Sequence, residues 1–369
     1  MKIAVDLTFI EGCFTSGVAT YAFRLLQGFR EAGARDSIIL LVDERFADGY
    51  RHLIDDFRMI PFKSRHLPLL PLSRGPLSCR SLDKLVKREG IQALISPYIC
   101  DRNLHANSIP CIGVVHDTSQ FYQNNPIFRF RYRIGTIASC NRLKAIVAIS
   151  DNTRESLRLL PAIQTPVTVI HNSVISSANP SLKKVCEPPY ILNVNTLLEY
   201  KNPLTLVRAF ERIKDRIPHR LLFKGARTSY WNQQVEPYLK RHHLEGRVQL
   251  DDTQSSQEEI AGLFVNADLF VSPSEMEGFG YTPIEAALAG VPVICNELPA
   301  LMESTMGLAT YYSPSRDDAA LAEKILFVLG NRDRIDVEGI RAKYAEKYSP
   351  HRQARAFISL IESITGESF

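Results

Sequence analysis

The stretch DLFVSPSEMEGFGYTPIEAALAGVPVICNELPA, residues 268–300, alternates apolar runs with a loop that contains two glycines. The run Leu269–Val271 predicts a buried strand, and Val291–Cys295 predicts a second one. Between them the pattern predicts a helix that ends at Gly290. A strand, a glycine loop, a helix and another strand in this order are typical of an α/β fold with a parallel sheet.

The loop and the start of the helix form a predicted anion site. Thr282 is expected to cap the helix, Pro283 to fill its first position and Glu285 to complete a capping box. Backbone N–H groups and the helix dipole at such an N-terminus favour a negatively charged ligand. Phosphate is therefore the expected ligand.

Two acidic residues flank the glycines, Glu277 before them and Glu285 after them. Carboxylates beside a phosphate suit the hydroxyl groups of a sugar or ribose, which donate hydrogen bonds to them. The alternative is that Glu285 only completes the capping box and that Glu277 is a solvated loop residue. The order Glu-Gly-Phe-Gly, Pro283 and Glu285-Ala resembles the Glu-x7-Glu motif of retaining family 4 glycosyltransferases, and this makes the alternative unattractive.

Composition describes an ordinary globular protein of 369 residues, 45% hydrophobic and 23% charged, which is long enough for two domains. No apolar run approaches the ~18 residues of a membrane span, and residues 1–6 lead into a strand rather than a signal peptide. Seven scattered cysteines without metal spacing indicate a cytoplasmic protein with reduced, buried thiols. Residues 1–180 hold 22 Lys and Arg against 15 Asp and Glu, so this half is expected to face anionic surfaces.

Hydrophobic periodicity predicts two α/β halves joined by the polar segment 176–189, which ends in Glu187-Pro188-Pro189. Each half alternates strands with helices, which indicates two doubly wound, Rossmann-like domains facing a cleft. We expect strands at 2–7, 37–42, 91–96, 110–116, 145–149, 167–171, 190–194, 220–225 and 248–250, and a loop at 61–76. Helices are expected at 18–32, 78–89, about 128–143, 203–216, 230–243, 258–266, 317–329, 335–348 and 350–364.

Three segments outside the central stretch resemble the same family. The loop Thr15–Tyr21, with Gly17, is similar to its first glycine loop, which lies near the donor phosphates and the acceptor. His116 ends an apolar strand, where a capping role is the simpler interpretation; the resemblance implies instead that it lines the donor-sugar pocket. Residues 170–174 resemble the hinge before the second domain, with Ser173 where glycine is usual.

A fourth segment, residues 194–202, resembles the family's loop after the first strand of the donor domain, whose lysine contacts the diphosphate; the resemblance implies that Lys201 is a phosphate ligand. A flexible ammonium group can stabilise the charge that grows on a leaving diphosphate. The family often has an arginine at the positions that Thr196 and Tyr200 occupy here, which leaves one phosphate cation instead of two. Arg227, after the predicted strand at 220–225, is a possible replacement.

The resemblance implies the GT-B fold, with an acceptor-binding domain at 1–180 and a donor-binding domain at 188–349. The last helix, about 350–369, would cross back to the first domain. Glu285 would bind the ribose of the nucleotide, Glu277 the hydroxyls of the sugar, and Lys201 the diphosphate. The loop Gly278, Phe279 and Gly280 would bind sugar and phosphate through backbone amides. The implied reaction retains the anomeric configuration by front-face attack, without an enzymatic nucleophile.

The sequence also lacks several motifs. There is no Asp-x-Asp diphosphate clamp, which predicts a metal-independent enzyme without a cofactor. There is no Gly-x-Gly-x-x-Gly and no Gly-x-Ser-x-Gly, which disfavours a nicotinamide dehydrogenase and a serine hydrolase. A nucleotide-sugar epimerase or hydrolase on the same fold and a non-catalytic partner subunit stay open.

The expected partners are a GDP-, UDP- or dTDP-linked sugar and a glycan or lipid-linked acceptor of a surface polysaccharide such as O-antigen or capsule; no nucleic acid is expected. A further candidate partner is an anionic membrane surface, namely the inner face of the cytoplasmic membrane. Residues 128–133 interleave aromatic residues with arginines, and residues 63–74 mix cations with leucines. Both patterns are typical of segments that contact anionic lipid.

Overall fold

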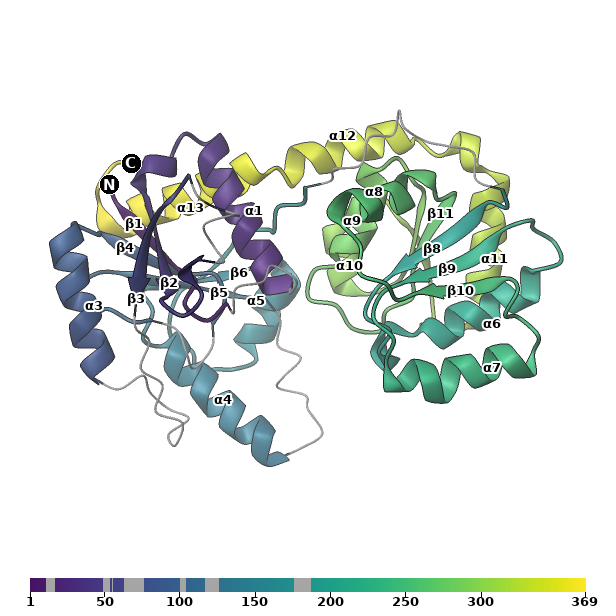
Figure 1. Cartoon of the computed structure of the whole chain (residues 1–369), viewed down its shortest axis with the longest axis horizontal. Helices are drawn as coiled ribbons and strands as arrows, with labels where there is room; N and C mark the ends of the chain where they lie inside the picture. Colours follow the sequence, from purple (N-terminus) through teal and green to yellow (C-terminus); the bar gives the residue numbers. More distant parts are fainter. Residues whose placement is uncertain are drawn as a thin grey trace. The chain divides into compact units, whose positions relative to one another are not determined.

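The structure is a computed structural model that describes residues 1–10, 17–48, 54, 56–62, 76–99, 104–116, 126–175 and 187–369. The chain forms two compact units (Figure 1). Unit 1 comprises residues 1–173 and 348–369, and unit 2 comprises residues 174–347. Each has its own parallel sheet covered by helices, which is the α/β, GT-B-like architecture predicted from the sequence.

Unit 1 holds a seven-stranded parallel sheet in the order β3-β2-β1-β4-β5-β6-β7, so the order reverses between β1 and β4. In the register of this sheet, Ile3 lies opposite Ile38 on one side and Ala93 on the other. The strands are β1 (Ile3–Asp6), β2 (Ile38–Asp43), β3 (Arg58–Phe62), β4 (Ala93–Ser96), β5 (Cys111–Val115), β6 (Ala145–Ala148) and β7 (Val167–Val169). The helices are α1 (Gly17–Glu31), α3 (Pro76–Glu89), α4 (Pro126–Cys140), α5 (Asp151–Arg158) and α13 (Pro350–Thr365), with the short helix η1 (Arg35–Ser37).

Unit 2 holds a six-stranded parallel sheet in the order β10-β9-β8-β11-β12-β13, which reverses between β8 and β11. Figure 1 shows α8, α9 and α10 on one side of this sheet and α6, α7 and α11 on the other. The strands are β8 (Tyr190–Val194), β9 (Arg220–Lys224), β10 (Val248–Asp251), β11 (Leu269–Ser272), β12 (Val293–Asn296) and β13 (Thr310–Tyr312). The helices are α6 (Pro203–Ile213), α7 (Glu236–Arg241), α8 (Gln257–Asn266), α9 (Tyr281–Leu288), α10 (Pro299–Ser304), α11 (Asp318–Gly330) and α12 (Val337–Lys347), with the short helices η4 (Glu199–Lys201), η5 (Trp231–Val235) and η6 (Arg332–Arg334).

Central strands are apolar along their whole length because helices cover both faces of a parallel sheet. Every residue of β2 and of β11 is buried. The core of unit 2 joins strand residues such as Leu221 and Val271 to Phe210 of α6 and Ile325 of α11. These apolar runs were the signals from which the strands were predicted.

The C-terminal helix α13 packs against α1 within unit 1. Gly28 of α1 permits this approach, because a Cβ atom there would lie 2.2 Å from the carbonyl oxygen of Pro350. Gln353 of α13 bonds the hydroxyl of Ser173 (2.8 Å) and the carbonyl of His171 (3.2 Å). The hinge-like segment at residues 170–174 is therefore fastened to the last helix of the chain.

Apart from the short helices η1, η4 and η6, the described elements that were not predicted from the sequence are β3, α5, α10 and β13. The expected loop at 61–76 was wrong at its start, since Pro61 and Phe62 end β3, and at its end, since Pro76 begins α3; residues 63–75 lie outside the described residues. β3 tolerates a proline because it is the edge strand of its sheet. The single helix expected at 230–243 contains a π-helical segment, η5, directly before α7. Pro237 lacks an N–H group and cannot make the bond of a regular α-helix there.

No described helix is long and apolar enough to cross a membrane. Three cysteines within the described residues are free and buried: Cys111, Cys140 and Cys295. Burial raises the pKa of the Cys140 thiol to about 12, and burial also raises the pKa of Cys295. These thiols stay protonated at neutral pH, as expected of core residues rather than nucleophiles.

Candidate active site

The carboxyl edge of the unit 2 sheet brings Lys201 and Glu277 together. In open parallel sheets, ligands bind outside the strand ends at the point where the strand order reverses, here between β8 and β11. Lys201 ends η4, shortly after β8, and Glu277 lies in the loop after β11. The Lys201 Nζ atom is 2.6 Å from the Glu277 Oε1 atom, and the two side chains are 14% and 12% exposed. Glu277 is therefore not a solvated loop residue.

The position of Lys201 is fixed by the residue that follows it. Asn202 has the left-handed conformation (φ 56°), which asparagine tolerates better than most residues. Its side-chain amide donates to the carbonyl of Ser315 (2.8 Å) and its carbonyl oxygen accepts from Thr205 (2.7 Å). This turn ends η4 and starts α6, so the lysine lies at a rigid corner between two helices.

The loop that carries Glu277 is held by two buried asparagines at strand positions. Asn193 of β8 donates to the carbonyl of Val271 (2.8 Å), and Asn296 at the end of β12 donates to the carbonyl of Ser274 (2.9 Å). Hydrogen bonds of this kind satisfy backbone groups that leave the sheet and would otherwise be buried without partners. They fix the backbone up to three residues before Glu277.

The N-terminus of α9 differs from the prediction. The N-cap is Gly280 (φ 84°), no side chain caps the helix, and the capping box expected from Thr282 and Glu285 is wrong. The positive φ angle lets the chain turn sharply into the helix, and a Cβ atom at Gly280 would lie 2.5 Å from Leu301. Glu285 is half-buried and lies in the second turn of α9.

Three buried polar atoms close to this edge have no hydrogen-bond partner in the described residues. They are the hydroxyls of Ser272 and Ser274, which are fully buried, and the side-chain nitrogen of Asn195. The serines lie at and after the end of β11, and Asn195 directly follows β8. Buried polar atoms without partners are rare in proteins, and these three belong to or follow β8 and β11, the strands between which the sheet order reverses.

Arg227 does not point freely at this region. Its guanidinium donates to Asp252 (2.8 Å) and Glu236 (3.0 Å), and the hydrogen bond to Asp252 raises the pKa of Arg227. The preceding Gly225 (φ 152°) is required by close packing, because a Cβ atom there would lie 1.8 Å from the carbonyl oxygen of Asn195. The loop after β9 thus lies against the loop after β8, while the charge of Arg227 is balanced by acids.

The remaining predicted residues lie as follows. Phe279 is buried and Gly278 half-buried in the loop before α9, whereas Thr196 is exposed after β8. Gly17 is exposed at the first position of α1, and a Cβ atom there would meet nothing within 4 Å. Packing in the described part of the chain therefore does not require glycine at position 17, unlike Gly280. Thr15 and Ser16 lie outside the described residues.

His116 follows β5 at the carboxyl edge of the unit 1 sheet. Its Nε2 atom is 2.7 Å from the carbonyl oxygen of Pro97, and its ring meets that of Tyr21 edge to face, 4.6 Å between centroids. Nearby, Asp6 is fully buried, and its carboxylate accepts from the backbone N–H of Leu104 (2.8 Å) and from Thr8 (2.7 Å).

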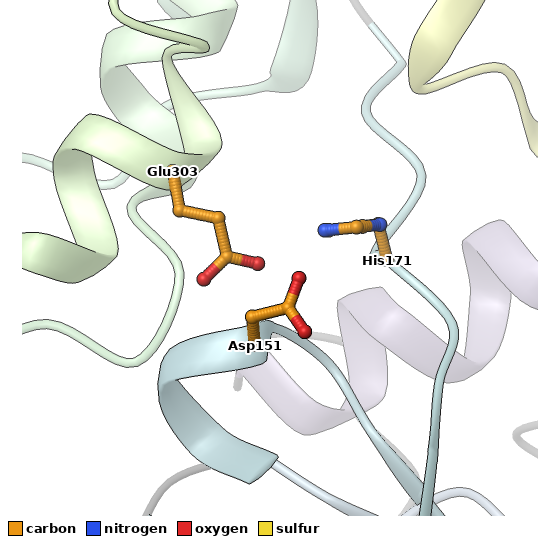
Figure 2. A group of neighbouring side chains, drawn as sticks. All are labelled: Asp151, His171 and Glu303. Carbon is orange, nitrogen blue, oxygen red and sulfur yellow. The ribbon is translucent and has the colours of Figure 1, made fainter. Parts of the chain in front are cut away.

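A second group in unit 1 involves Asp151, at the start of α5, and His171, after β7; Figure 2 labels both, together with Glu303 of α10 in unit 2. Ligand atoms of Asp151 and His171 lie within 4.8 Å of each other. Asp151 is half-exposed and paired with Arg154 (2.5 Å). Metal sites in proteins take at least three ligands, so these two unit 1 residues alone do not form one.

Both halves of the chain match known families. Residues 15–177 match the family described as Glycosyltransferase Family 4, and residues 176–349 match Glycosyl transferases group 1. The chain belongs to the family 4, group 1 glycosyltransferases. The two matches meet near the boundary between the two units.

Relatives and solved structures agree with this family. The chain is 27% identical over 202 residues to an O-antigen chain mannosyltransferase of Salmonella typhimurium, and 28% identical over 232 residues to O-antigen chain mannosyltransferase B of Escherichia coli. These alignments cover 54% and 58% of the chain and 56% and 60% of the relatives, so the chain spans little more than half the length of the relatives that it matches. The structure of a Rickettsia africae glycosyltransferase aligns over 100% of this chain and 99% of its own length, with a TM-score of 0.75 and 17% identity. The structure of the Anabaena protein HepE with UDP and glucose aligns over 98% of this chain and 100% of its own length, with a TM-score of 0.70 and 14% identity. These likenesses show the fold.

Sequence reasoning missed several residues that shape the candidate site. Asn193, Asn296 and Asn202 act through hydrogen bonds to distant backbone carbonyls. Asparagine at strand ends, and directly before the helix-starting Pro203, was the available signal, because these are positions where its side chain commonly bonds backbone groups. The partners themselves are far apart in sequence and were not readable from it.

Proposed function

We propose that this chain transfers a sugar from a nucleoside-diphosphate sugar to a hydroxyl group of a glycan or lipid-linked acceptor, with retention at the anomeric carbon. The observation that carries the proposal is the contact of Lys201 with Glu277 at 2.6 Å, where the strand order of unit 2 reverses. A cation for the diphosphate and a carboxylate for sugar hydroxyls stand side by side there.

Each residue has a role in this proposal. Lys201 binds the diphosphate, Glu277 accepts hydrogen bonds from the hydroxyls of the transferred sugar, and Glu285 from those of the ribose. The backbone of Gly278, Phe279 and Gly280, at the N-terminus of α9, binds sugar and phosphate. His116 would contact the transferred sugar, as the family resemblance implies. Unit 2 is thus the donor-binding part, and unit 1 the acceptor-binding part.

The chemical step is a front-face displacement. The acceptor oxygen forms its bond to the anomeric carbon on the side from which the diphosphate leaves, while the bond from that carbon to the phosphate oxygen breaks. The leaving phosphate oxygen takes the acceptor proton. Charge grows on the diphosphate during this step, so Lys201 and the α9 N-terminus contribute most by stabilising it.

In the free protein Glu277 neutralises Lys201, and the two side chains are largely shielded from water. A diphosphate that enters competes with Glu277 for the ammonium group. Once the lysine follows the phosphate, the carboxylate is released for the hydroxyls of the sugar. Donor binding would therefore replace one ion pair by two ligand contacts.

The relatives suggest the biological setting. Two of them are O-antigen chain mannosyltransferases, and a third, 31% identical over 102 residues, is a lipopolysaccharide core biosynthesis mannosyltransferase of Rhizobium meliloti. We extend this to the present chain as a proposal: it adds an α-linked sugar, with mannose the first candidate, to a growing bacterial surface polysaccharide. UDP-glucose is a second donor to test, because HepE was crystallised with it.

The proposed function is tested by two linked measurements. Thermal stabilisation is screened with GDP-mannose, UDP-glucose and dTDP-sugars, since a ligand at ~100 times its Kd adds about 2.7 kcal/mol to the free energy of unfolding. The stabilising donor is then incubated with lipid-linked glycan, and the product is analysed for an added α-linked sugar. Stabilisation followed by hydrolysis or epimerisation of the donor alone would indicate the alternative enzyme class, and no stabilisation by any donor would contradict the assignment of the site.

We further propose that the basic first part of the chain docks on an anionic membrane. Residues 128–133 lie on α4, whereas the second candidate segment, residues 63–74, lies outside the described residues. Each basic residue near a negative leaflet contributes roughly 1 kcal/mol. Sedimentation with anionic liposomes should weaken at high salt and when Arg129, Arg131 and Arg133 are changed to Ser. Equal binding to neutral vesicles would contradict it.

A further inference from the structure

We propose that Glu275 is a positioning residue, which holds the Lys201 and Glu277 segments together through its ion pair with Arg316. The inference rests on the proposed function, because it concerns how the same site is kept in register. Glu275 lies between these segments: it precedes Glu277 by two residues, and its backbone N–H donates to the carbonyl of Tyr200 (2.7 Å), the residue before Lys201.

The side chain of Glu275 forms hydrogen bonds with a third segment, residues 315 and 316. Its two oxygens accept from Nε (2.6 Å) and Nη2 (2.9 Å) of Arg316, a bidentate pair of defined geometry. Ser315 adds a hydrogen bond from its hydroxyl to Oε1 (3.2 Å). The hydrogen bond from Arg316 holds the pKa of the Glu275 carboxyl below its ordinary value, so the pair stays ionised in neutral solution.

The segment that supplies Arg316 also contacts the lysine side of the site. The carbonyl of Ser315 accepts from the side chain of Asn202, directly after Lys201, at 2.8 Å. Residues 315 and 316, just before α11, thus bond both the turn after Lys201 and the loop before Glu277. Three segments far apart in the sequence meet at Glu275, and the catalytic pair projects from two of them.

The effect of this ion pair on catalysis can be measured separately from its effect on folding. The Arg316 side chain is 68% exposed, and exposed ion pairs contribute little to stability. The same pair, however, sets where the loop before Glu277 lies against η4. Since a displacement of about 1 Å in a catalytic group costs up to ~10²-fold in rate, losing the pair should slow transfer without unfolding the protein.

The experiment compares Glu275→Gln, Arg316→Gln and the double variant in the full chain, with Arg316→Lys as the conservative variant. Arg212→Gln is the matched control: Arg212 pairs with Asp318 in the same unit, and the two side chains are 55% and 24% exposed, against 68% and 21% for Arg316 and Glu275. Turnover and the KM for the donor are measured separately, together with the midpoint of thermal unfolding.

We expect either single variant to lower kcat about 10-fold with little change in the donor KM. The double variant should be no slower than the singles, because both remove one interaction. Arg316→Lys should retain an intermediate rate, and Arg212→Gln should stay within about twofold of wild type, as do most surface changes.

Three results would overturn the inference: single variants as fast as wild type, losses that multiply in the double variant, or a raised KM with unchanged kcat. The last would mean that Arg316 itself binds the donor. A wild-type protein that transfers no sugar from any donor is a different result, because it defeats the proposed function before any variant is compared.

Discussion

The carboxyl edges of the two sheets differ in how their polar groups are balanced. In unit 1, buried Asp6 accepts from a backbone N–H and a threonine, and the ion pairs Asp43–Arg45 and Asp151–Arg154 join residues two or three positions apart. In unit 2, the ion pairs join different segments: Lys201 with Glu277, Lys224 with Asp251, and Arg316 with Glu275. Both sheets share the strand order 3-2-1-4-5-6 counted within each unit.

The shared order places loops at corresponding edges, while the residues in those loops decide the chemistry. Hydrogen bonds to neutral groups, such as those that Asp6 accepts, suit the orientation of hydroxyl groups. An edge with exchangeable ion pairs can bind a charged diphosphate, since a ligand anion can replace a carboxylate partner. The comparison therefore predicts that substitutions in unit 2 affect rate through charge, and that substitutions in unit 1 have smaller effects.

The largest effect is expected from Lys201→Ala. Removing a group that stabilises charge in the transition state typically lowers turnover ~10²- to 10³-fold. Steady-state kinetics with saturating donor would measure this loss. Lys240→Ala is the control, since Lys240 forms an exposed pair with Glu236 on α7 and should be neutral. Unchanged turnover in Lys201→Ala would mean that another cation holds the diphosphate, with Arg227 tested next.

Substitutions of Glu277 and Glu285 should impair contacts with different parts of the donor. Glu277→Ala should lower turnover more than it weakens binding of the bare nucleoside diphosphate, because its proposed partner is the sugar. Glu285→Ala should weaken nucleotide binding roughly 10-fold, as expected for hydrogen bonds to a charged group. Calorimetry with the nucleotide and kinetics with the sugar donor distinguish them. If Glu277→Ala transfers sugar as fast as wild type, the assignment of this site is wrong.

His116→Ala tests the unit 1 side of the comparison. The imidazole lies at hydrogen-bond distance from the carbonyl oxygen of Pro97 and against the ring of Tyr21, and a neutral hydrogen bond contributes about 0.5–1.5 kcal/mol. Turnover should therefore fall roughly 10-fold or less, with folding retained in circular dichroism. A loss as large as that of Lys201→Ala would show that unit 1 carries charge stabilisation too, against the comparison.

Chelation should have the smallest effect. The sequence has no Asp-x-Asp clamp, and Lys201 with the α9 N-terminus supplies positive charge for the diphosphate. Transfer measured in excess EDTA should equal transfer in buffer. A rate that collapses and returns on addition of Mg²⁺ or Mn²⁺ would assign the diphosphate to a metal.

Sequence alone predicted most strands of both sheets, and the phosphate site beside Glu277 stays a prediction. Apolar runs such as Leu269–Val271 report burial locally, and the Glu-x7-Glu spacing is itself a local signal. It could not predict that Gly280 caps α9 or that Asn202 turns left-handed, since both depend on the packing of neighbouring segments.

A polar helix and a long-range ion pair were also not predicted from the sequence. The helix α5 has the sequence DNTRESLR, which is too polar for apolar periodicity to reveal. Its N-cap is Ser150, whose side chain accepts a hydrogen bond from the backbone N–H of Thr153. The contact between Glu275 and Arg316 joins residues 41 positions apart, and no local pattern encodes such a pair. Local signals therefore identified the elements, and tertiary contacts set the geometry of the site.

The central claim is that Lys201 and Glu277 hold each other until a diphosphate replaces the carboxylate. Calorimetric titration of wild type, Lys201→Gln and Glu277→Gln with the nucleoside diphosphate of the preferred donor tests it directly. Lys201→Gln should bind about 10-fold more weakly, because a hydrogen bond to a charged group is lost. Glu277→Gln should bind at least as tightly as wild type, because its lysine is no longer neutralised. If both variants weaken binding equally, or if neither changes it, the account is contradicted.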